Sequence, residues 1–426
     1  MTIVVFLGSL LGVMALGVPI AFALLASGVA LMWHLDIFDS QILAQNVIGG
    51  ADSFPLLAVP FFMLAGEIMN VGGLSRRIVD LALALVGHVK GGLGYVTIMA
   101  GCLLSALSGS AVADAAALTA LLLPMMVSAG HRKDTAGGLI AATGVIGPVI
   151  PPSIGLVIFG VAANVSISKL FMAAIVPGLM LGGALWLTWF WLARREKLVP
   201  PPRKSVQEIG TAFRKALWAL MLPVIILVGL RMGVFTPTEA AVVAATYALL
   251  VSTLVYRELK LNQLYAVFVS AAKTSAIVMF LIAAAMVSAW LITVADLPAK
   301  VVDMLQPFMG NKILLMAAIM VLVMVVGTAM DMTPTILILT PVLMPLVRAA
   351  GIDPVYFGVL FIINNSIGLV TPPVGAVLNV VAGVGKMKMD DVTRGVVPFM
   401  AAEFLVMFLM VAFPALVIVP ARWFGG

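Results

Sequence analysis

Two short stretches combine hydroxyl, acidic and glycine residues within an otherwise apolar chain. The first is SALSGSAVADAA, residues 105–116, and the second is VVGTAMDMTPT, residues 325–335. Glycine permits unusual backbone angles and close approach, and serine and threonine supply hydroxyl oxygens. A helix that starts after such a turn presents free N–H groups and the positive end of its dipole, which attract anions. Each stretch therefore offers oxygen ligands for a cation and backbone amides for an anion.

A Pro-Pro pair interrupts an apolar segment in each half of the chain, in VIGPVIPPSIG, residues 145–155, and in SIGLVTPPVGA, residues 366–376. Proline lacks an N–H and clashes with the preceding turn, so each pair releases backbone carbonyls from helical hydrogen bonding. An unpaired carbonyl in lipid costs several kcal/mol. Sodium is a hard cation that prefers oxygen ligands and can satisfy such carbonyls. The breaks therefore predict sodium sites, about two in number.

The elements that must position these residues are membrane helices. The 426 residues are 63% hydrophobic and 10% charged. A helix that crosses the roughly 30 Å hydrocarbon core needs about 20 apolar residues, and such runs recur throughout. We predict an all-α polytopic membrane protein with about nine full transmembrane crossings, because the alternating pattern of a membrane β-barrel is absent. The expected crossings cover residues 3–31, 54–73, 135–163, 170–193, 216–234, 238–256, 274–296, 354–383 and 396–420.

Two further apolar segments, residues 93–128 and 313–347, are too long for one crossing and carry Gly, Ser, Thr and Asp near their middle. A re-entrant helical hairpin fits each of them: one helix enters, the chain turns at mid-membrane, and a second helix returns. Irregular backbone at that depth is tolerated only inside protein or beside a watery cavity. The short, charged and mildly amphipathic segments 75–90 and 297–311 are expected to be interfacial arm helices.

The distribution of basic residues predicts the orientation. If the first hairpin opens to the cytoplasm, 18 of the 24 Lys and Arg residues lie inside and 6 lie outside. Cytoplasmic loops carry an excess of Lys and Arg, so this orientation is favoured. It places the N-terminus in the cytoplasm and the C-terminus on the outer side. The same loops account for the net charge of +6, so we expect no nucleic-acid partner.

The two halves of the chain match in the order of their motifs. Equivalent residues keep a near-constant spacing, which is 217 positions for Asp114 and Asp331 and for Pro124 and Pro341, and 221 positions for Pro151 and Pro372. Such a spacing indicates an internal repeat. One hairpin opens inward and the other outward, so the repeats are inverted, as in many secondary transporters with broken helices at the midplane.

The resulting division of the chain has five parts. They are an N-terminal scaffold helix (1–49), a first inverted repeat (50–196), a cytoplasmic linker (197–215), scaffold helices (216–265) and a second inverted repeat (266–426). Each repeat is expected to hold an arm helix, a hairpin and a broken helix.

The hairpin sequences SGSAVADAAAL and GTAMDMTPTI, followed by GPVIPPSI and GLVTPPVG, resemble the large membrane subunit of TRAP transporters, the tripartite ATP-independent periplasmic carriers. The resemblance covers essentially the whole chain. It implies an elevator mechanism, sodium coupling and organic acid anions such as sialic acid or C4-dicarboxylates as substrates. It also implies a bacterial inner membrane, a separate small four-helix membrane subunit, and a periplasmic solute-binding protein that delivers the substrate.

The resemblance further implies which residues form two sodium sites. The first would use Ser108 or Ser110 with Gly147, Ile150 and Pro152. The second would use Gly327 with Gly368, Thr371 and Val374. Most of these residues would contribute backbone carbonyls. The second site would have an additional hydroxyl, because Thr371 stands where the first half has Ile150.

Five polar residues are candidates for contact with the transported anion, namely Asp114, Thr328, Asp331, Asn364 and Asn365. Each acid either caps the returning helix of its hairpin or touches ion or substrate directly. The two asparagines either bond the loop backbone or line the substrate cavity. Glu67, in MLAGEIMN, is either a proton site or an interface residue.

Three other functions each require features that can be looked for in the sequence. An ion channel needs a continuous polar pore, but the sequence has no ring of charges and no repeated filter sequence. An intramembrane enzyme needs a motif such as HExxH, a Ser–His dyad or an aspartate dyad in a GxGD setting. The sequence has no HExxH, and Asp114 and Asp331 lack a GxGD setting. We therefore predict a transporter and not an enzyme. A stand-alone sodium/dicarboxylate symporter with similar inverted hairpins remains open, and uptake with and without an added binding protein would separate it from a TRAP carrier.

Overall fold

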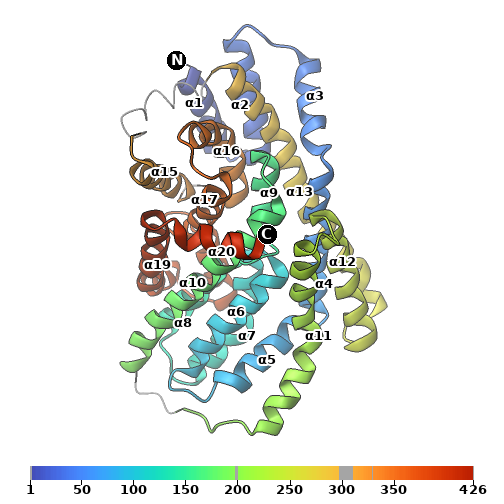
Figure 1. Cartoon of the computed structure of the whole chain (residues 1–426), viewed down its shortest axis with the longest axis vertical. Coiled ribbons are helices and arrows are strands. Elements are labelled where there is room, and N and C mark those ends of the chain that lie inside the picture. Colours follow the sequence, from blue (N-terminus) through green and yellow to red (C-terminus); the bar gives the residue numbers. More distant parts are fainter. Residues whose placement is uncertain (1, 197–199, 297–309, 329, 426) are drawn as a thin grey trace.

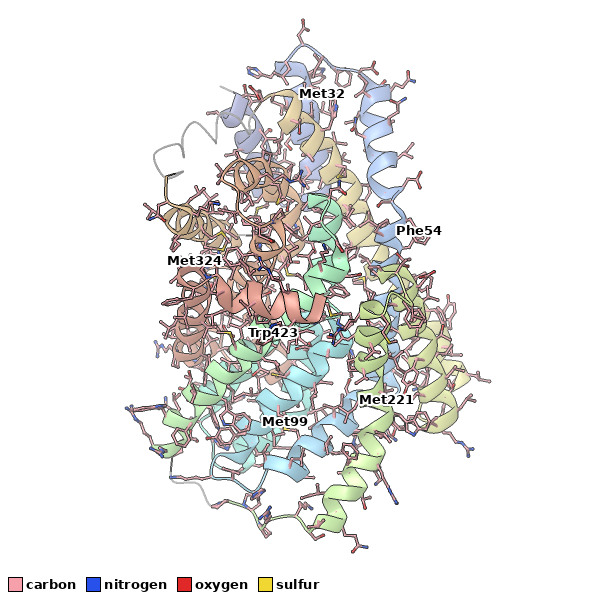
Figure 2. All side chains as sticks on the ribbon, viewed as in Figure 1. Met32, Phe54, Met99, Met221, Met324 and Trp423 are labelled. Carbon is pink, nitrogen blue, oxygen red and sulfur yellow. The ribbon has the colours of Figure 1, made fainter. Side chains whose placement is uncertain are left out.

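The chain is helical throughout the part that the computed structural model describes, which is residues 2–196, 200–296, 310–328 and 330–425, and no strand occurs there. Eight helices in these ranges are long and apolar enough to cross a membrane. The all-α membrane fold predicted from the sequence is thereby confirmed. Large apolar side chains stay exposed, among them Phe54, Met221 and Trp423 (Figure 2), as expected for a surface that faces lipid.

Figure 1 shows the arrangement of the elements. The first half contains α1 (Thr2–Ala15), α2 (Ile20–His34), α3 (Ser40–Ala51), the 3-10 turn η1 (Phe54–Leu57), α4 (Ala58–Val71), α5 (Leu74–Val86), α6 (Gly92–Ser108), α7 (Ala111–Ser128), α8 (Lys133–Val145), α9 (Ile154–Ala163) and α10 (Ile167–Arg194). The second half contains α11 (Val206–Arg231), α12 (Pro237–Leu250), the π-helical turn η2 (Val251–Val255), α13 (Leu261–Val294), α15 (Lys312–Gly327), α16 (Met332–Ala349), α17 (Pro354–Gly368), α18 (Ala376–Gly385), α19 (Met389–Ala412) and α20 (Ala415–Gly425).

Both predicted hairpins and both predicted breaks are present. The segment 93–128 folds as α6 and α7, and the segment 313–347 folds as α15 and α16. The chain leaves the helix between α8 and α9 and again between α17 and α18, and each break contains its Pro-Pro pair.

The repeat is regular in the structure, with a spacing of 221 residues. Ala111 and Met332 begin the returning hairpin helices α7 and α16, and the prolines of the two breaks keep the same spacing. The spacing of 217 residues that pairs Asp114 with Asp331 is therefore wrong. Asp331 corresponds to Ser110, and both residues are the N-caps of their helices.

The two hairpins open at opposite ends of α10, which is about 42 Å long at 1.5 Å per residue. At its C-terminal end, Lys90 donates to the carbonyl of Arg194 at 3.2 Å, next to the mouth of the first hairpin. At its N-terminal end, Arg348 from the mouth of the second hairpin donates to the carbonyl of Ala163 at 2.8 Å. The repeats are thus inverted, as the sequence predicted.

The crossings predicted at the two ends of the chain are each divided into two helices. The segment 3–31 forms α1 and α2, because Gly17 has a positive φ of 80° and Pro19 has no N–H to continue a helix. The segment 396–420 is divided between α19 and α20, because Phe413 precedes a proline and leaves the helical region. The single helices expected in both places are wrong.

The predicted linker 197–215 is partly helical. The structure does not describe 197–199, but α11 begins at Val206. Ser205 and Glu208 form a capping box there, with the serine hydroxyl accepting from the Glu208 N–H and the Glu208 carboxylate accepting from the Ser205 N–H. This S-x-x-E signature starts the helix inside the segment expected to be a linker.

Helices α3, α4, α11, α12 and α13 lie together along one flank of the molecule, whereas α15, α17 and α19 lie on the opposite flank (Figure 1). We call the first group the scaffold flank. Helix α5 packs on both α11 and the hairpin helix α6, as an arm between the two flanks would. The other predicted arm, 297–311, falls almost entirely outside the described residues.

Glycines let the helices around the first hairpin approach closely. A Cβ on Gly138 of α8 would lie 2.0 Å from the backbone carbon of Gly395 on α19. A Cβ on Gly94 of α6 would lie 2.0 Å from the ring of Trp189 on α10, whose indole N–H donates to the carbonyl of Gly91 at 2.8 Å. These small residues join the hairpin and the surrounding helices into one packed unit.

Candidate ion and substrate site

The turn of the first hairpin lies against the first helix break. Helix α6 ends at Ser108, Gly109 follows with φ of 62°, and the hydroxyl of Ser110 caps α7 by accepting from the Ala113 N–H at 3.4 Å. A Cβ on Gly109 would lie 2.6 Å from the carbonyl oxygen of Pro152. Both the left-handed backbone and this close approach therefore require glycine in the turn.

We call the contact between the hairpin turn and the helix break the first junction. Asp114 points into it from the first turn of α7. Its Oδ1 accepts a hydrogen bond of 2.5 Å from the hydroxyl of Ser108. Its Oδ2 is buried, accepts no hydrogen bond from the described residues, and lies 2.8 Å from the place where a Cβ of Gly147 would be. Asp114 is therefore not the cap of its helix. It fixes the turn with one oxygen and presents the other to the helix break.

Backbone oxygens complete the first junction. The carbonyls of Gly147, Ile150 and Pro152 accept no hydrogen bond from the described part of the chain. The side chain of Ile150 packs towards Gly178 of α10, so only its backbone is available as a ligand. Ser153 is committed elsewhere, because its hydroxyl donates to the carbonyl of Pro148 and accepts from the Leu156 N–H. The first break and Asp114 thus hold four oxygens that have no hydrogen-bond partner in the described part of the chain.

The second junction has the same plan with different ligands. The carbonyl oxygen of Gly327 lies 2.9 Å from the place where a Cβ of Gly368 would be, and the Val374 N–H donates to the carbonyl of Thr328 at 3.4 Å. The carbonyl of Gly368 already accepts from the Thr371 N–H, and that of Val374 accepts from the side chain of Asn379. A carbonyl has a second lone pair, so both remain capable of binding a cation.

The hydroxyl expected to strengthen the second site donates its hydrogen to the backbone, and its oxygen keeps the lone pairs that a cation would need. Thr371 donates its hydroxyl to the carbonyl of Ile367 at 2.8 Å, within its own helix turn, and lies near the sulfur of Met400. The hydroxyl of Thr328 likewise donates to the carbonyl of Val325 at 2.8 Å. Both threonines therefore use their hydroxyl hydrogens on local backbone carbonyls. Such hydrogen bonds to carbonyls three or four residues earlier in the chain are common for threonine in helices.

Asp331 and Asp114 have different roles. Asp331 is exposed and caps α16, since its Oδ1 accepts from the Met332 N–H at 2.8 Å. The capping interpretation is confirmed for Asp331 and is wrong for Asp114.

The two asparagines bond helix carbonyls rather than the loop backbone, and neither lines the cavity beside the first hairpin. Asn364 donates to the carbonyl of Met320 at 2.5 Å and so ties α17 to the hairpin helix α15. Asn365 donates to the carbonyl of Phe361 at 2.8 Å, and its Oδ1 is buried without a partner among the described residues. That oxygen lies 4.0 Å from the place where a Cβ of Gly327 would be. Asn365 therefore presents an oxygen to the second junction, as Asp114 does to the first.

A cavity of about 90 Å³ separates the first hairpin from the scaffold flank. We call it the hairpin cavity. Its lining comes from α4, α13, the hairpin turn and the start of α9: Met63, Gly66, Glu67, Asn70, Ser108, Ser110, Ala113, Ile154 and Thr274. Glu67 accepts a hydrogen bond of 3.2 Å from Ser270 and so holds its carboxylate beside this cavity.

The comparisons with known proteins show the family of this chain. The family model for the tripartite ATP-independent periplasmic transporter, DctM component, matches residues 7–416. This chain belongs to the TRAP transporter large permease family. It is a transport permease and not an enzyme.

Named relatives of this TRAP permease cover nearly its full length. It is 58% identical over 99% of its length to the whole of the Escherichia coli (strain K12) protein named 2,3-diketo-L-gulonate TRAP transporter large permease protein YiaN. It is 39% identical to the sialic acid TRAP transporter large permease protein SiaM of Vibrio cholerae, covering 98% of this chain and 97% of that one. It is 36% identical to the C4-dicarboxylate TRAP transporter large permease protein DctM of Pseudomonas aeruginosa, covering 90% of each.

A solved structure shares the fold of this TRAP permease. The Alcanivorax borkumensis YdaH transporter matches it with a TM-score of 0.65 over 92% of this chain and 91% of that one, at 17% identity. At that identity the likeness concerns the fold alone.

Three polar residues of the TRAP permease were absent from the substrate candidates. Glu67, Asn70 and Thr274 line the hairpin cavity together with the hairpin serines. Nothing in the local sequence shows which face of α4 or α13 meets the hairpin. A glutamate in an apolar span was nevertheless a usable sign, since intramembrane acids are rare without a function.

Proposed function

We propose that this permease imports an organic acid anion together with sodium, after a periplasmic solute-binding protein delivers the anion. The main support is the first junction, where the free Oδ2 of Asp114 and the unpaired carbonyls of Gly147, Ile150 and Pro152 gather around one helix break. Oxygen ligands of this kind suit a hard monovalent cation. An ionised carboxylate buried without a partner is costly, so a cation at this place would stabilise the fold.

The second junction is the counterpart site. It offers the carbonyls of Gly327 and Thr371 and the amide oxygen of Asn365, without a carboxylate. The two sites therefore differ in charge, and the first is expected to hold sodium more tightly. Sodium at these junctions would supply positive charge close to the hairpin turns, where an anion has to bind.

The hairpin cavity is the proposed place of the anion. The side-chain N–H groups of Asn70 and the hydroxyl hydrogen of Ser110 have no acceptor among the described residues and can bond a carboxylate or a hydroxylated carbon chain. The hydroxyls of Ser108 and Thr274 already donate, to Asp114 and to the carbonyl of Ser270. Because the relative at 58% identity is named for 2,3-diketo-L-gulonate, a keto-sugar acid is the first substrate to test. Sialic acid and C4-dicarboxylates, named for relatives at 39% and 36% identity, follow.

The place of the cavity supports a moving unit. It lies between the first hairpin on one side and α4 and α13 on the other, so a shift of the hairpin along these helices would change its shape and its access. We propose an elevator motion, in which the packed unit of hairpins and broken helices slides along the scaffold flank while α5 links the two.

The remaining components follow from the family. We propose a small four-helix membrane subunit and a periplasmic binding protein as partners, and the bacterial inner membrane as the location. The excess of basic residues at the end where the first hairpin opens supports placing that end in the cytoplasm.

Reconstitution tests the whole proposal. The permease and its small subunit are placed in proteoliposomes, and uptake of labelled 2,3-diketo-L-gulonate, sialic acid and succinate is measured with the binding protein added outside. We expect uptake of one of these acids only when both the binding protein and an inward sodium gradient are present. Potassium in place of sodium should abolish it.

Two outcomes would contradict the proposal. Uptake that is unchanged in potassium refutes sodium coupling. Uptake by the permease alone, without the binding protein or the small subunit, refutes the three-component scheme and supports a stand-alone symporter.

A further inference from the structure

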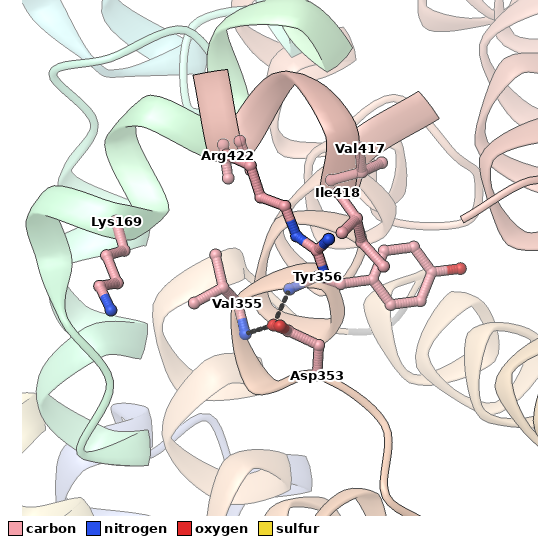
Figure 3. Close-up of a pocket in the computed structure, with 9 residues that line it drawn as sticks. Lys169, Asp353, Val355, Tyr356, Val417, Ile418 and Arg422 are labelled. Carbon is pink, nitrogen blue, oxygen red and sulfur yellow. Dashed lines mark hydrogen bonds between the residues drawn. The ribbon is translucent and has the colours of Figure 1, made fainter. Parts of the chain in front are cut away.

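The C-terminal helix α20 covers two adjoining cavities that are remote from the hairpin junctions. It packs along α10, and its end is tied to the scaffold flank because Arg231 of α11 donates to the carbonyl of Trp423 at 3.3 Å. The cavities measure about 170 and 280 Å³ and share Asp353, Tyr356, Ile418 and Arg422 in their linings. We call the pair the α20 pocket. It lies at the end of α10 where the second hairpin opens (Figure 3).

Positive charge dominates the rim of the α20 pocket. Lys169 comes from the start of α10, Lys312 from the start of α15 and Arg422 from α20. The side chains of Lys169 and Arg422 form no ion pair or hydrogen bond with the described residues, and Lys312 donates to the carbonyl of Gly351 at 2.8 Å. Asp353 is the acid of the pocket, so the four groups carry a net formal charge of +2.

The acid of the pocket is already engaged. Oδ1 of Asp353 accepts from the N–H groups of Val355 and Tyr356, at 2.7 and 3.0 Å, and so caps α17 (Figure 3). The carboxylate is therefore used to start a helix, and Lys169 and Arg422 are left as two cations with no anionic partner. An anionic ligand would complete this arrangement.

Apolar surface continues from the rim in both directions. The lining below the charges includes Ala173, Val355, Val417 and Ile418 on one side and Ile313, Met316, Val411 and Pro414 on the other. Beside the pocket, the side chains of Ile313, Phe413 and Trp423 are 45%, 60% and 71% exposed. In a protein with eight membrane-length helices, such side chains are expected to face acyl chains or the membrane interface.

We propose that the α20 pocket binds the phosphate headgroup of an anionic phospholipid, whose acyl chains lie over the exposed apolar side chains. The cations recognise the phosphodiester, and the apolar walls recognise the chain that is attached to it. Free phosphate would use the cations but would gain nothing from Ile313 or Phe413. The mixed lining therefore favours a lipid as the occupant.

Thermal unfolding of the purified, delipidated permease in neutral detergent tests this inference. Phosphatidylglycerol, phosphatidylcholine with the same chains, and inorganic phosphate are each titrated. We expect phosphatidylglycerol to raise the unfolding midpoint at micromolar concentrations, and the other two to have little effect. Each basic residue near a lipid headgroup contributes about fivefold in affinity, so Lys169→Gln with Arg422→Gln should weaken phosphatidylglycerol binding about 25-fold.

The matched control is Lys388→Gln with Arg394→Gln. These residues carry the same charges, are exposed, and lie at the start of α19 near the mouth of the first hairpin. This control should bind phosphatidylglycerol as the wild type does. Both pocket side chains lack partners among the described residues, so their removal should leave the unfolding midpoint of the lipid-free protein unchanged.

Three results would overturn the inference. Equal stabilisation by phosphatidylcholine would show that the pocket does not recognise the charge of the headgroup. Equal stabilisation by inorganic phosphate would make the pocket a simple anion site. Equal loss of binding in the pocket variant and in the control would show that only the total charge matters. The first two measurements use the wild type alone, so they remain decisive even if the variant folds poorly.

Discussion

A methyl group added at Gly147 is a direct test of the first junction. An ideal Cβ there lies 2.8 Å from Asp114 Oδ2 and 3.0 Å from the backbone nitrogen of Ala111 and the backbone carbon of Ser110, whereas ordinary contacts are 3.4–4 Å. Two of these three neighbours are backbone atoms of the hairpin turn and cannot rotate away. The Gly147→Ala variant must therefore separate the hairpin from the helix break.

The cost can be bounded from these overlaps. Inserting one methyl group into a well-packed site costs about 1–3 kcal/mol. Because the cation ligands come from both sides of the junction, the same separation should weaken sodium binding by about 5- to 150-fold. The equivalent Gly368→Ala change places a Cβ 2.9 Å from the carbonyl oxygen of Gly327 and should weaken the second site instead.

The rise of the unfolding midpoint with sodium measures this effect without transport. Binding stabilises the folded state in proportion to the logarithm of ligand concentration, by about 2.7 kcal/mol at 100 times the Kd. The wild type should be stabilised by sodium and not by potassium, and Gly147→Ala should need much more sodium for the same rise. Gly183→Ala is the control, since a Cβ at that position of α10 meets nothing within 4 Å.

A sodium response of Gly147→Ala within twofold of the wild type would refute the proposed role of the junction. The conclusion would be the same if Gly183→Ala lost the response equally, because the effect would then be general to the fold.

Three further outcomes are expected. Asp114→Asn should weaken sodium stabilisation about 10- to 100-fold, the range for an interaction with a charged group, whereas Asp331→Asn should leave it unchanged, and equal effects would contradict the assigned roles. Gly138→Ala should destabilise the protein by about 3 kcal/mol, seen as a lower unfolding midpoint, because its Cβ meets the α19 backbone; an unchanged midpoint would contradict that packing. The side-chain hydrogen bond from Arg132 holds the pKa of Asp134 below its usual value. The pair therefore stabilises the fold above the unfolded pKa of Asp134 and loses that effect as the pH falls through the folded pKa. Arg132→Gln should lower the stability by under about 1 kcal/mol at neutral pH and by nothing in strong acid, and a loss of stability that persists in acid would contradict this cause.

The hairpins and the helix breaks could be predicted because their residues are unusual in an apolar chain. Gly, Ser, Asp and Pro-Pro each have few roles at mid-membrane, so their positions alone indicated where helices stop. The register between the halves was harder. A search for identical residues paired Asp114 with Asp331, whereas the structure pairs Asp331 with Ser110, because aspartate and serine both serve as N-caps.

Other features depend on packing that a sequence does not display. The sequence does not show that the hydroxyl of Thr371 donates to the carbonyl of Ile367, a bond that fixes the position of its oxygen. Glu67 lines the hairpin cavity because α4 lies beside the hairpin turn, which is distant from it in the sequence. The break before Pro19 lies within a continuous apolar run, where hydropathy alone indicates a single span.

Residues 40–194 and the described residues of 261–412 form the two inverted repeats. The two repeats do not have the same shape. Helix α13 runs unbroken over 34 residues, whereas its counterpart is bent between α3 and α4. The inverted symmetry of the two repeats is therefore broken at residues 52–57, where the first repeat has an interruption and the second has continuous helix.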